Sequence, residues 1–194
     1  GFDRLGFIFY PAEAGGEEKV LEAAMEAGAE DIASTDDGHE IWTAPDDLHA
    51  VAEALGLSLT GCAAIPAPYR ERGQVAYRTG QRIVEMVRED LKPSDILTRE
   101  AFLNAVAAVS VLGGSSNAQP HIQAMAAHAG VPLEASVWQD HGYDLPLLLN
   151  MQPAGQYLGE RFHRAGGVPA VLWELLEAGK LYGDVLTCTG RTMA

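Results

Sequence analysis

The chain has 194 residues, of which 47% are hydrophobic, so it can bury the core of one domain or of two small ones. Its net charge of −14 argues against sequence-independent nucleic-acid binding, which needs a basic surface, and against adhesion to anionic membranes. The two distant cysteines, Cys62 and Cys188, form no disulfide framework, and no apolar run is long enough to span a membrane, which together predict a cytoplasmic protein.

The amino-terminal part of the chain predicts short strands and helices in alternation. Residues 6–10 are typical of a strand that ends at Pro11, and residues 17–27 are typical of a helix. Two further strands flank the pair Asp37 and Gly38, which is a strong hairpin signal, and a second helix follows over residues 46–55. This β-α-β-β-α order is typical of the beginning of a ferredoxin-like layer.

The rest of the chain predicts mainly helices. An irregular connector over residues 59–72 leads into a helix over residues 73–91, whose inward face is expected to hold Val75, Thr79, Ile83, Met86 and Val87. Further helices are expected over residues 99–112, 119–128, 155–165 and 168–178, and short strands over residues 146–151 and 184–189. We therefore predict an α+β fold, with a β-α-β-β-α module in residues 1–54 and a mainly helical segment with one or two short strands in residues 55–194.

A glycine-rich loop between two of the expected helices is the first candidate for chemistry. It consists of Gly113, Gly114, Ser115, Ser116 and Asn117. Glycine lets a ligand approach the backbone closely, and the start of the next helix, with its free N–H groups and positive dipole end, favours an anion such as a carboxylate. The alternative is an ordinary joint in which Ser or Asn caps the next helix.

Histidines and one arginine are further candidates. His121 lies four residues after Asn117 on the same helix face, so it either faces the same ligand or is a packed histidine. Arg164 precedes a glycine pair and could hold a carboxylate, although packing at a helix end explains it as well. His39 and His49 have no partner at a metal-binding spacing, so we predict no metal ligand among them.

The amino-terminal stretch GFIFYPAE…EEKVLEAAMEAGAEDI…DDGHEIWTAPDDLHAVAEAL resembles the carboxy-terminal half of the YebC family of transcription and translation regulators. The resemblance covers about fifty residues. It implies an α+β module from a nucleic-acid- or ribosome-associated protein. The acidic charge of the chain argues against a nucleic-acid partner.

A second resemblance covers residues 51–194. The blocks EALGLSLTGCAAIPAPYRERGQ, RIVEMVREDLKPSDILTREAFLNA, GGSSNAQPHI, PLLLNMQPAGQYLGERFHRAGGVPAVL and GDVLTCTGRTMA resemble the dihydroxy-acid and sugar-acid dehydratases (IlvD/Edd family), nearest to its aldonate-type, arabinonate dehydratase-like members. That family implies an iron–sulfur cluster acting as a Lewis acid on the departing hydroxyl, a magnesium ion, a small carboxylate substrate and a 2-keto acid product, and it allows a homo-oligomer.

The resemblance assigns a substrate-binding role to part of the loop. Gly113, Gly114, Ser115 and Asn117 match the family pattern, Ser116 stands where Thr is usual, and His121 matches a recurrent position. Cys62 and Cys188 match no cluster-ligand motif, and a cluster needs about four ligands. The family's magnesium ligands and catalytic base lie outside the matched blocks. We therefore expect no catalytic or metal-binding residue here and no cofactor bound by this chain alone.

Three hypotheses follow. The first is a fragment of an iron–sulfur-dependent dehydratase of dihydroxy acids or aldonates, since the chain starts without Met and both ends look cut. This fragment is expected to be inactive alone, because it lacks the cluster, metal and base residues of the family. The second is a regulatory module governed by the YebC-like segment. The third is a fusion or sequence artefact without evolved function, because the two resemblances meet within residues 51–59.

Overall fold

The computed structural model describes residues 6–11, 20, 31–35, 38–43, 46–152 and 155–194, and the helix expected over residues 17–27 falls outside these apart from Val20. The elements in chain order are β1 (Gly6–Pro11), β2 (Asp31–Thr35), β3 (Gly38–Thr43), α2 (Asp46–Ala54), α3 (Arg70–Glu89), α4 (Pro93–Ile96), α5 (Arg99–Leu112), α6 (Ala118–His128), the π-helical turn η2 (Trp138–Gly142), α7 (Gly159–Arg164) and α8 (Gly167–Glu177).

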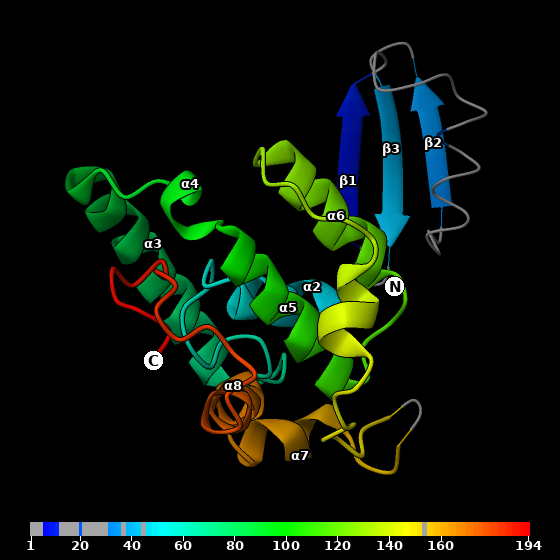
Figure 1. The fold of residues 1–194 in the computed structure, drawn as a ribbon. Helices are drawn as coiled ribbons and strands as arrows, with labels where there is room; N and C mark the ends of the chain where they lie inside the picture. Colours follow the sequence, from blue (N-terminus) through cyan, green and yellow to red (C-terminus); the bar gives the residue numbers. More distant parts are fainter. Residues whose placement is uncertain (1–5, 12–19, 21–30, 36–37, 44–45, 153–154) are drawn as a thin grey trace.

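The three strands form one antiparallel sheet in the order β1-β3-β2. β2 and β3 are consecutive and pair across residues 36–37, with Thr35 opposite Gly38 and Ile32 opposite Ile41. β1 joins the other edge of β3, with Phe7 opposite Trp42. The sheet projects from the helices at one end of the molecule, as Figure 1 shows.

Helix α5 is the centre of the helical part. Its side chains from Ala101 to Val109 are buried on all sides, which is typical of a helix that is apolar around its whole circumference. α2, α6, α8 and η2 pack around it. The resulting core includes Phe102 and Val106 of α5, Leu55 after α2, Ile122 of α6 and Val168 of α8. The described core is therefore formed by helices and the loops between them.

The predicted α+β fold class is wrong, because the described chain is mainly helical. A ferredoxin-like layer needs helices that cover its sheet, and α2 was expected to be one of them. Instead α2 packs against α5, α6 and α8, and no described helix contacts the strands to a similar extent. The physical reason is that Val51, Ala54 and Leu55 bury their apolar side chains in the helical core. The two expected later strands are also replaced, by isolated bridges from Met151 to Tyr157 and from Leu186 to Thr192.

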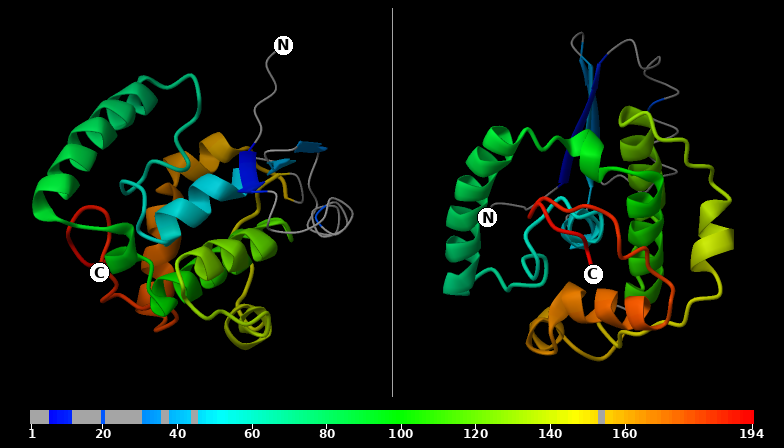
Figure 2. Two further views of the ribbon diagram at one scale, coloured as in Figure 1. Left: turned by 90° about the horizontal axis from the view of Figure 1, so that it is seen from above. Right: turned by 60° about the vertical axis from the view of Figure 1, so that its left-hand side comes forward.

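Helix α3 lies along the edge of the molecule, on the side away from the sheet (Figure 2). Of its side chains only Met86 is buried. Ile83 and Val87, which were expected to face inward, are 54% and 74% exposed. The reason is that α3 packs through a narrow stripe around Met86 and makes no broad contact with another helix.

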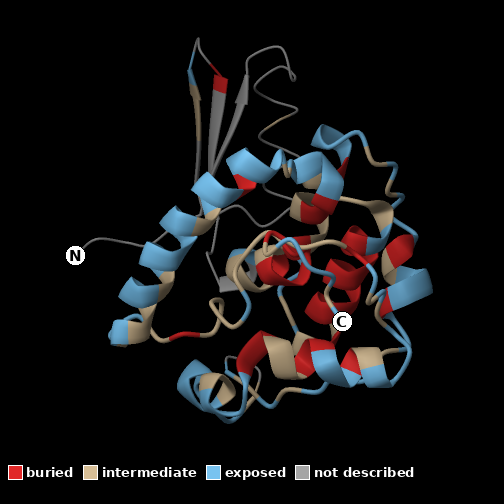
Figure 3. Ribbon diagram, turned by 90° about the vertical axis from the view of Figure 1, so that its left-hand side faces the viewer, coloured by how far each residue is buried: buried red, intermediate tan, exposed pale blue. Residues whose placement is uncertain are grey.

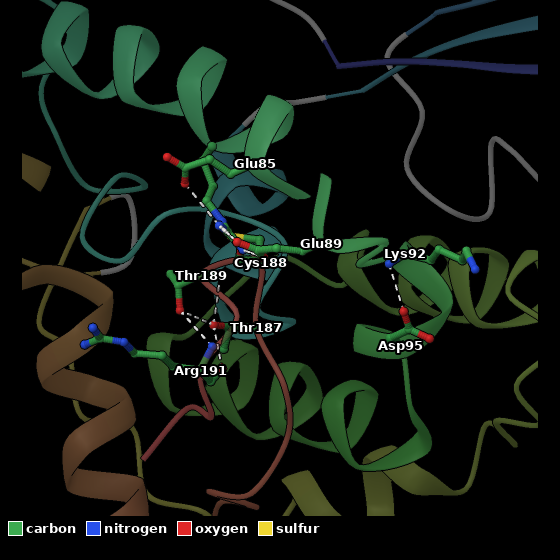
Figure 4. Close-up of polar contacts among 9 residues, drawn as sticks. Glu85, Glu89, Lys92, Asp95, Thr187, Cys188, Thr189 and Arg191 are labelled. Carbon is green, nitrogen blue, oxygen red and sulfur yellow. Dashed lines mark hydrogen bonds and ion pairs between the residues drawn. The ribbon is translucent and has the colours of Figure 1, made fainter. Parts of the chain in front are cut away.

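The carboxy-terminal loop holds α3 in place through Arg82. The guanidinium Nε donates a hydrogen bond to the Cys188 carbonyl at 2.6 Å, and the other nitrogens pair with Glu89 at 2.5 Å and Glu85 at 3.1 Å (Figure 4). These hydrogen bonds, above all those to Glu89, raise the pKa of Arg82 and lower the pKa of Glu89. The loop itself is tied to the end of α2, because the Cys188 N–H donates to the Gly56 carbonyl at 2.7 Å.

Candidate functional site

The glycine-rich loop begins where α5 ends. Gly113 has φ +68°, in the left-handed region, and the N–H of Gly114 donates to the Val109 carbonyl at 3.0 Å. A left-handed glycine followed by an amide that donates back to the last turn is a common way for a helix to end. A Cβ at Gly113 would also lie 2.7 Å from Leu147 Cδ1. The left-handed backbone conformation therefore favours glycine there, whereas the end of the exposed Leu147 side chain could move aside.

The start of α6 is already capped by the loop. The Ser115 hydroxyl accepts a hydrogen bond from the Asn117 N–H at 3.1 Å, and the Ala118 N–H donates to the Ser115 carbonyl at 3.0 Å. The Gln119 N–H donates to the Ser116 carbonyl at 3.2 Å. Asn117 precedes α6 without a side-chain capping bond. Several of the amides expected to bind an anion are therefore used inside the loop, and Ser115 has the capping role.

The first half of the loop lines a cavity of about 570 Å³. Gly113, Gly114 and Ser115 form one wall of it. The other walls come from α2, the connector before α3, the end of α5, the segment around α7 and the start of α8. The residues that line them are Ala50, Ala63, Ala64, Pro66, Leu112, Met151, Gln152, Gly159, Glu160, Phe162 and Val168. Ser116, Asn117 and His121, which were predicted to share this site, are not among the lining residues. His121 is half-buried on α6, which packs on α5 and α2.

A polar cluster surrounds Glu160, which lines this cavity. The Tyr69 hydroxyl donates to Glu160 Oε1 at 2.5 Å, and Arg164 Nη2 donates to the same oxygen at 2.7 Å. The hydrogen bond from Tyr69 and the charge of Arg164 lower the pKa of Glu160. The His163 ring meets Tyr69 edge-on, with 5.7 Å between ring centroids. The carboxylate that Arg164 holds is thus the one on its own helix, four residues earlier.

Glu53 holds the connector segment that lines part of the cavity, and nothing in the sequence pattern had singled it out. Its side chain is 4% exposed and accepts hydrogen bonds from the backbone N–H groups of Gly61 and Ala63, the latter at 2.9 Å. Burial raises the pKa of Glu53 in spite of these bonds. Because Ala63 and Ala64 line the cavity, Glu53 is a positioning residue that fixes this part of the connector.

Sequence reasoning could have found one of these contacts but not the others. Glu160 and Arg164 are four residues apart on α7, a spacing that brings side chains together on a helix. Tyr69 is 91 residues away from Glu160, and the partners of Glu53 are backbone groups in an irregular segment. No local pattern signals such pairs.

The described residues do not fit an iron–sulfur cluster or a magnesium ion. In these parts of the chain no three His, Cys, Asp or Glu side chains gather as metal ligands. Cys62 is half-buried and Cys188 is buried, both are free thiols, and burial raises the pKa of each. A cluster needs about four thiolate or equivalent ligands.

No helix within the described ranges is long and apolar enough to cross a membrane.

Comparisons with known proteins agree on one family. The family model described as "Dihydroxy-acid/6-phosphogluconate dehydratase N-terminal" matches residues 19–194. D-xylonate dehydratase of Caulobacter vibrioides is 71% identical over 147 residues, which are 76% of this chain and 24% of that protein. L-arabinonate dehydratase of Rhizobium leguminosarum bv. trifolii is 48% identical over 142 residues, 73% of this chain and 24% of its own length. Dihydroxy-acid dehydratase of Roseiflexus castenholzii is 44% identical over 147 residues, 76% of this chain and 26% of that protein.

Two consequences follow from these matches. The chain spans about a quarter of the length of these curated relatives. The resemblance of residues 1–54 to the YebC regulators finds no support in them, and the family match reaches back to residue 19, well inside that segment.

Proposed function

Because the chain belongs to the dihydroxy-acid/6-phosphogluconate dehydratase N-terminal family, we propose that it forms a substrate-side part of a sugar-acid dehydratase that takes aldonates. The observation that carries the proposal is the cavity of about 570 Å³ with Gly113, Gly114 and Ser115 in its wall. This volume lies within the range of about 300–1,000 Å³ that is typical of small-molecule sites. The aldonate class rests on the higher identity to D-xylonate dehydratase than to the dihydroxy-acid dehydratases.

The cavity lining offers a few polar groups to a small hydroxylated acid. The backbone of the two glycines allows close approach, and the Ser115 hydroxyl and the Gln152 amide add polar groups to an otherwise largely apolar lining. Glu160 brings a carboxylate to the rim, but the guanidinium of Arg164 lies 2.7 Å from it. This pairing reduces the repulsion that an anionic substrate would meet.

The chemistry of the family sets the limit of what this chain does alone. Dehydration of a 2,3-dihydroxy acid removes the proton next to the carboxylate and the neighbouring hydroxyl, and the iron–sulfur cluster of the family acts on that hydroxyl. We propose that this chain binds and orients the substrate, and that dehydration requires the rest of the enzyme. Ser116, Asn117 and His121 stay candidate substrate-binding residues, although they do not line this cavity.

A titration with D-xylonate, followed by calorimetry, tests this proposal. We expect saturable binding of D-xylonate, with weaker binding of the uncharged D-xylose. Gly113→Ala should weaken it, because the change adds a methyl group to a residue that lines the cavity. Gly130→Ala is the matched control: it also replaces a left-handed glycine after a helix, at φ +72°, but no atom lies within 4 Å of the new Cβ and it lines no part of this cavity. Equal losses in both variants, or equal binding of both sugars, would contradict the proposal.

We also propose that the chain divides into two parts, residues 1–54 and residues 55–194. Its support is that β1, β2 and β3 contact one another much more than they contact the helices. Helix α2 lies within the first part by number, yet it packs with the second. Limited proteolysis should release the strands before it cuts the helical part, and simultaneous loss of both would argue for a single unit.

A further inference from the structure

A second cavity, of about 560 Å³, is lined by α8, by the end of α2 and the residues after it, and by the carboxy-terminal loop that contains Cys188. It shares no lining residue with the cavity beside the glycine-rich loop. Its volume lies within the range of about 300–1,000 Å³ that is typical of small-molecule sites. The cavity is therefore a separate place at which the chain can take a ligand.

Helix α8 supplies the apolar wall of this second cavity. Leu172 and Leu176 line it from positions one turn apart, and Trp173 lines it with 60% of its surface exposed. Figure 3 shows buried and exposed positions alternating along α8. Aliphatic and aromatic side chains of this kind are the usual contacts for the carbon skeleton of a small ligand.

A hydrogen-bonded turn presents Arg191 to the cavity. The Arg191 carbonyl accepts from the N–H and from the hydroxyl of Thr187, both at 2.9 Å. The Arg191 N–H donates to the Thr189 hydroxyl at 3.3 Å. In Figure 4 the Arg191 side chain extends away from both threonines. The turn thus fixes the backbone of Arg191 and leaves its guanidinium for another partner.

No acidic side chain in the described ranges neutralises Arg191. The salt bridges of these ranges involve other cations, namely Arg70, Arg82, Lys92, Arg99 and Arg164. Arg191 is also the only cationic residue among those that line this cavity. A guanidinium offers a carboxylate two parallel, charge-assisted hydrogen bonds. The cavity therefore has a position for the carboxylate of a ligand.

Glu53 adds a buried hydrogen-bond acceptor to the lining. Its side chain is 4% exposed, and its two oxygens accept from the N–H groups of Gly61 and Ala63, one each. A carboxylate oxygen has two lone pairs, so each oxygen can accept one more hydrogen bond. Ser58 and Thr60 bring hydroxyl groups to the same cavity. These groups suit the hydroxyls of a ligand.

We propose that this cavity is a second small-molecule site, which takes a hydroxylated organic acid. Arg191 binds the carboxylate of the ligand, Glu53 accepts hydrogen bonds from its hydroxyl groups, and Trp173 contacts its carbon skeleton. A cationic ligand is disfavoured because the guanidinium repels it. An uncharged polyol leaves Arg191 without a partner, and an acid without hydroxyl groups leaves the remaining lone pairs of Glu53 unused.

The fluorescence of Trp173 reports on this cavity, so a titration with D-gluconate, a polyhydroxy acid, tests the proposal. We expect a saturable change that disappears in Trp173→Phe, a variant that keeps Trp42 and Trp138. D-glucitol, the uncharged polyol with the same carbon skeleton, should bind about tenfold more weakly or worse, because it lacks the charge-assisted hydrogen bonds to Arg191. The absence of a saturable change, a change that persists in Trp173→Phe, or equal binding of the two compounds overturns the proposal.

Variants separate this site from the first cavity. Arg191→Gln should weaken the binding seen by Trp173 about tenfold or more. Arg78→Gln is the matched control, since Arg78 is also exposed and without a salt bridge among the described residues but lines neither cavity. Gly113→Ala alters only the first cavity and should leave this signal unchanged, so failure here is distinguishable from failure of the proposed function. Circular dichroism should show equal helix content in all three variants. Equal weakening by Arg191→Gln and Arg78→Gln, or loss of the signal in Gly113→Ala but not in Arg191→Gln, refutes the assignment.

Discussion

The replacement of Asn104 by alanine should be among the most destabilising single changes in this chain. Asn104 lies on α5 with 0% exposure. Its Nδ2 donates to the Tyr182 carbonyl at 2.9 Å, and its Oδ1 accepts from the Tyr182 N–H at 2.8 Å. The side chain thereby fastens the chain after α8 to the central helix. Each such bond is worth about 1 kcal/mol, and the polar groups left without a partner add to the cost, so Asn104→Ala should lower the free energy of unfolding by about 3 kcal/mol.

Thermal unfolding followed by circular dichroism measures this effect. For a chain of this size, about 3 kcal/mol corresponds to a fall in Tm of about 6–12 °C. Asn150→Ala is the matched control, because Asn150 is exposed although its Oδ1 accepts from the Gln156 N–H at 2.7 Å. It should cost less than about 1 kcal/mol. Asn104→Asp keeps the acceptor but loses the donor to the Tyr182 carbonyl. Acidification protonates the new carboxylate and supplies an O–H donor, so it should restore part of the stability of this variant. Similar losses for Asn104→Ala and Asn150→Ala would refute the reasoning from burial.

Three further predictions concern polar groups around the site. Arg82→Ala should lower the free energy of unfolding by about 1–2 kcal/mol in urea titrations, whereas Arg78→Ala, on the exposed side of the same helix, should change it by less than about 0.5 kcal/mol. The pKa of Glu53 is raised in the folded chain, so its favourable contribution is complete below the ordinary carboxyl pKa and is lost as the pH rises through the raised value. Glu53→Gln should therefore gain in stability relative to the unmodified chain as the pH is raised above about 4.5, and a difference that does not vary with pH would contradict this. Tyr69→Phe removes the hydrogen bond that contributes most to the lowered pKa of Glu160, so this pKa should rise toward its ordinary value in carboxyl NMR titrations.

The local pattern of residues was sufficient for the boundaries of the central helix. A helix was expected over residues 99–112, and the structure has α5 over this range, with the Thr98 hydroxyl accepting from the Ala101 N–H. The end at Gly113, in the left-handed region, also follows from the sequence. Capping and glycine conformation depend on neighbours within a few residues, so they can be read without the fold. The relation to the dehydratases likewise came from consecutive sequence blocks and is confirmed by the family match.

Tertiary contacts decided which side of each element is buried, and here the sequence misled. The apolar residues Ile83 and Val87 were expected to face inward, and the α+β class assumed that α2 covers the sheet. Periodicity shows that a helix has an apolar side, but it does not show whether the chain itself or a partner covers that side.

By itself, then, the sequence determined the family and the helices on either side of the glycine-rich loop. Only the tertiary structure separated Gly113 to Ser115, which line the cavity, from His121, which does not line it. It alone joined Tyr69 to Glu160 and Glu53 to the connector. These partners are brought together by the packing of elements distant in the chain or by irregular backbone, and neither leaves a periodic trace in the order of residues.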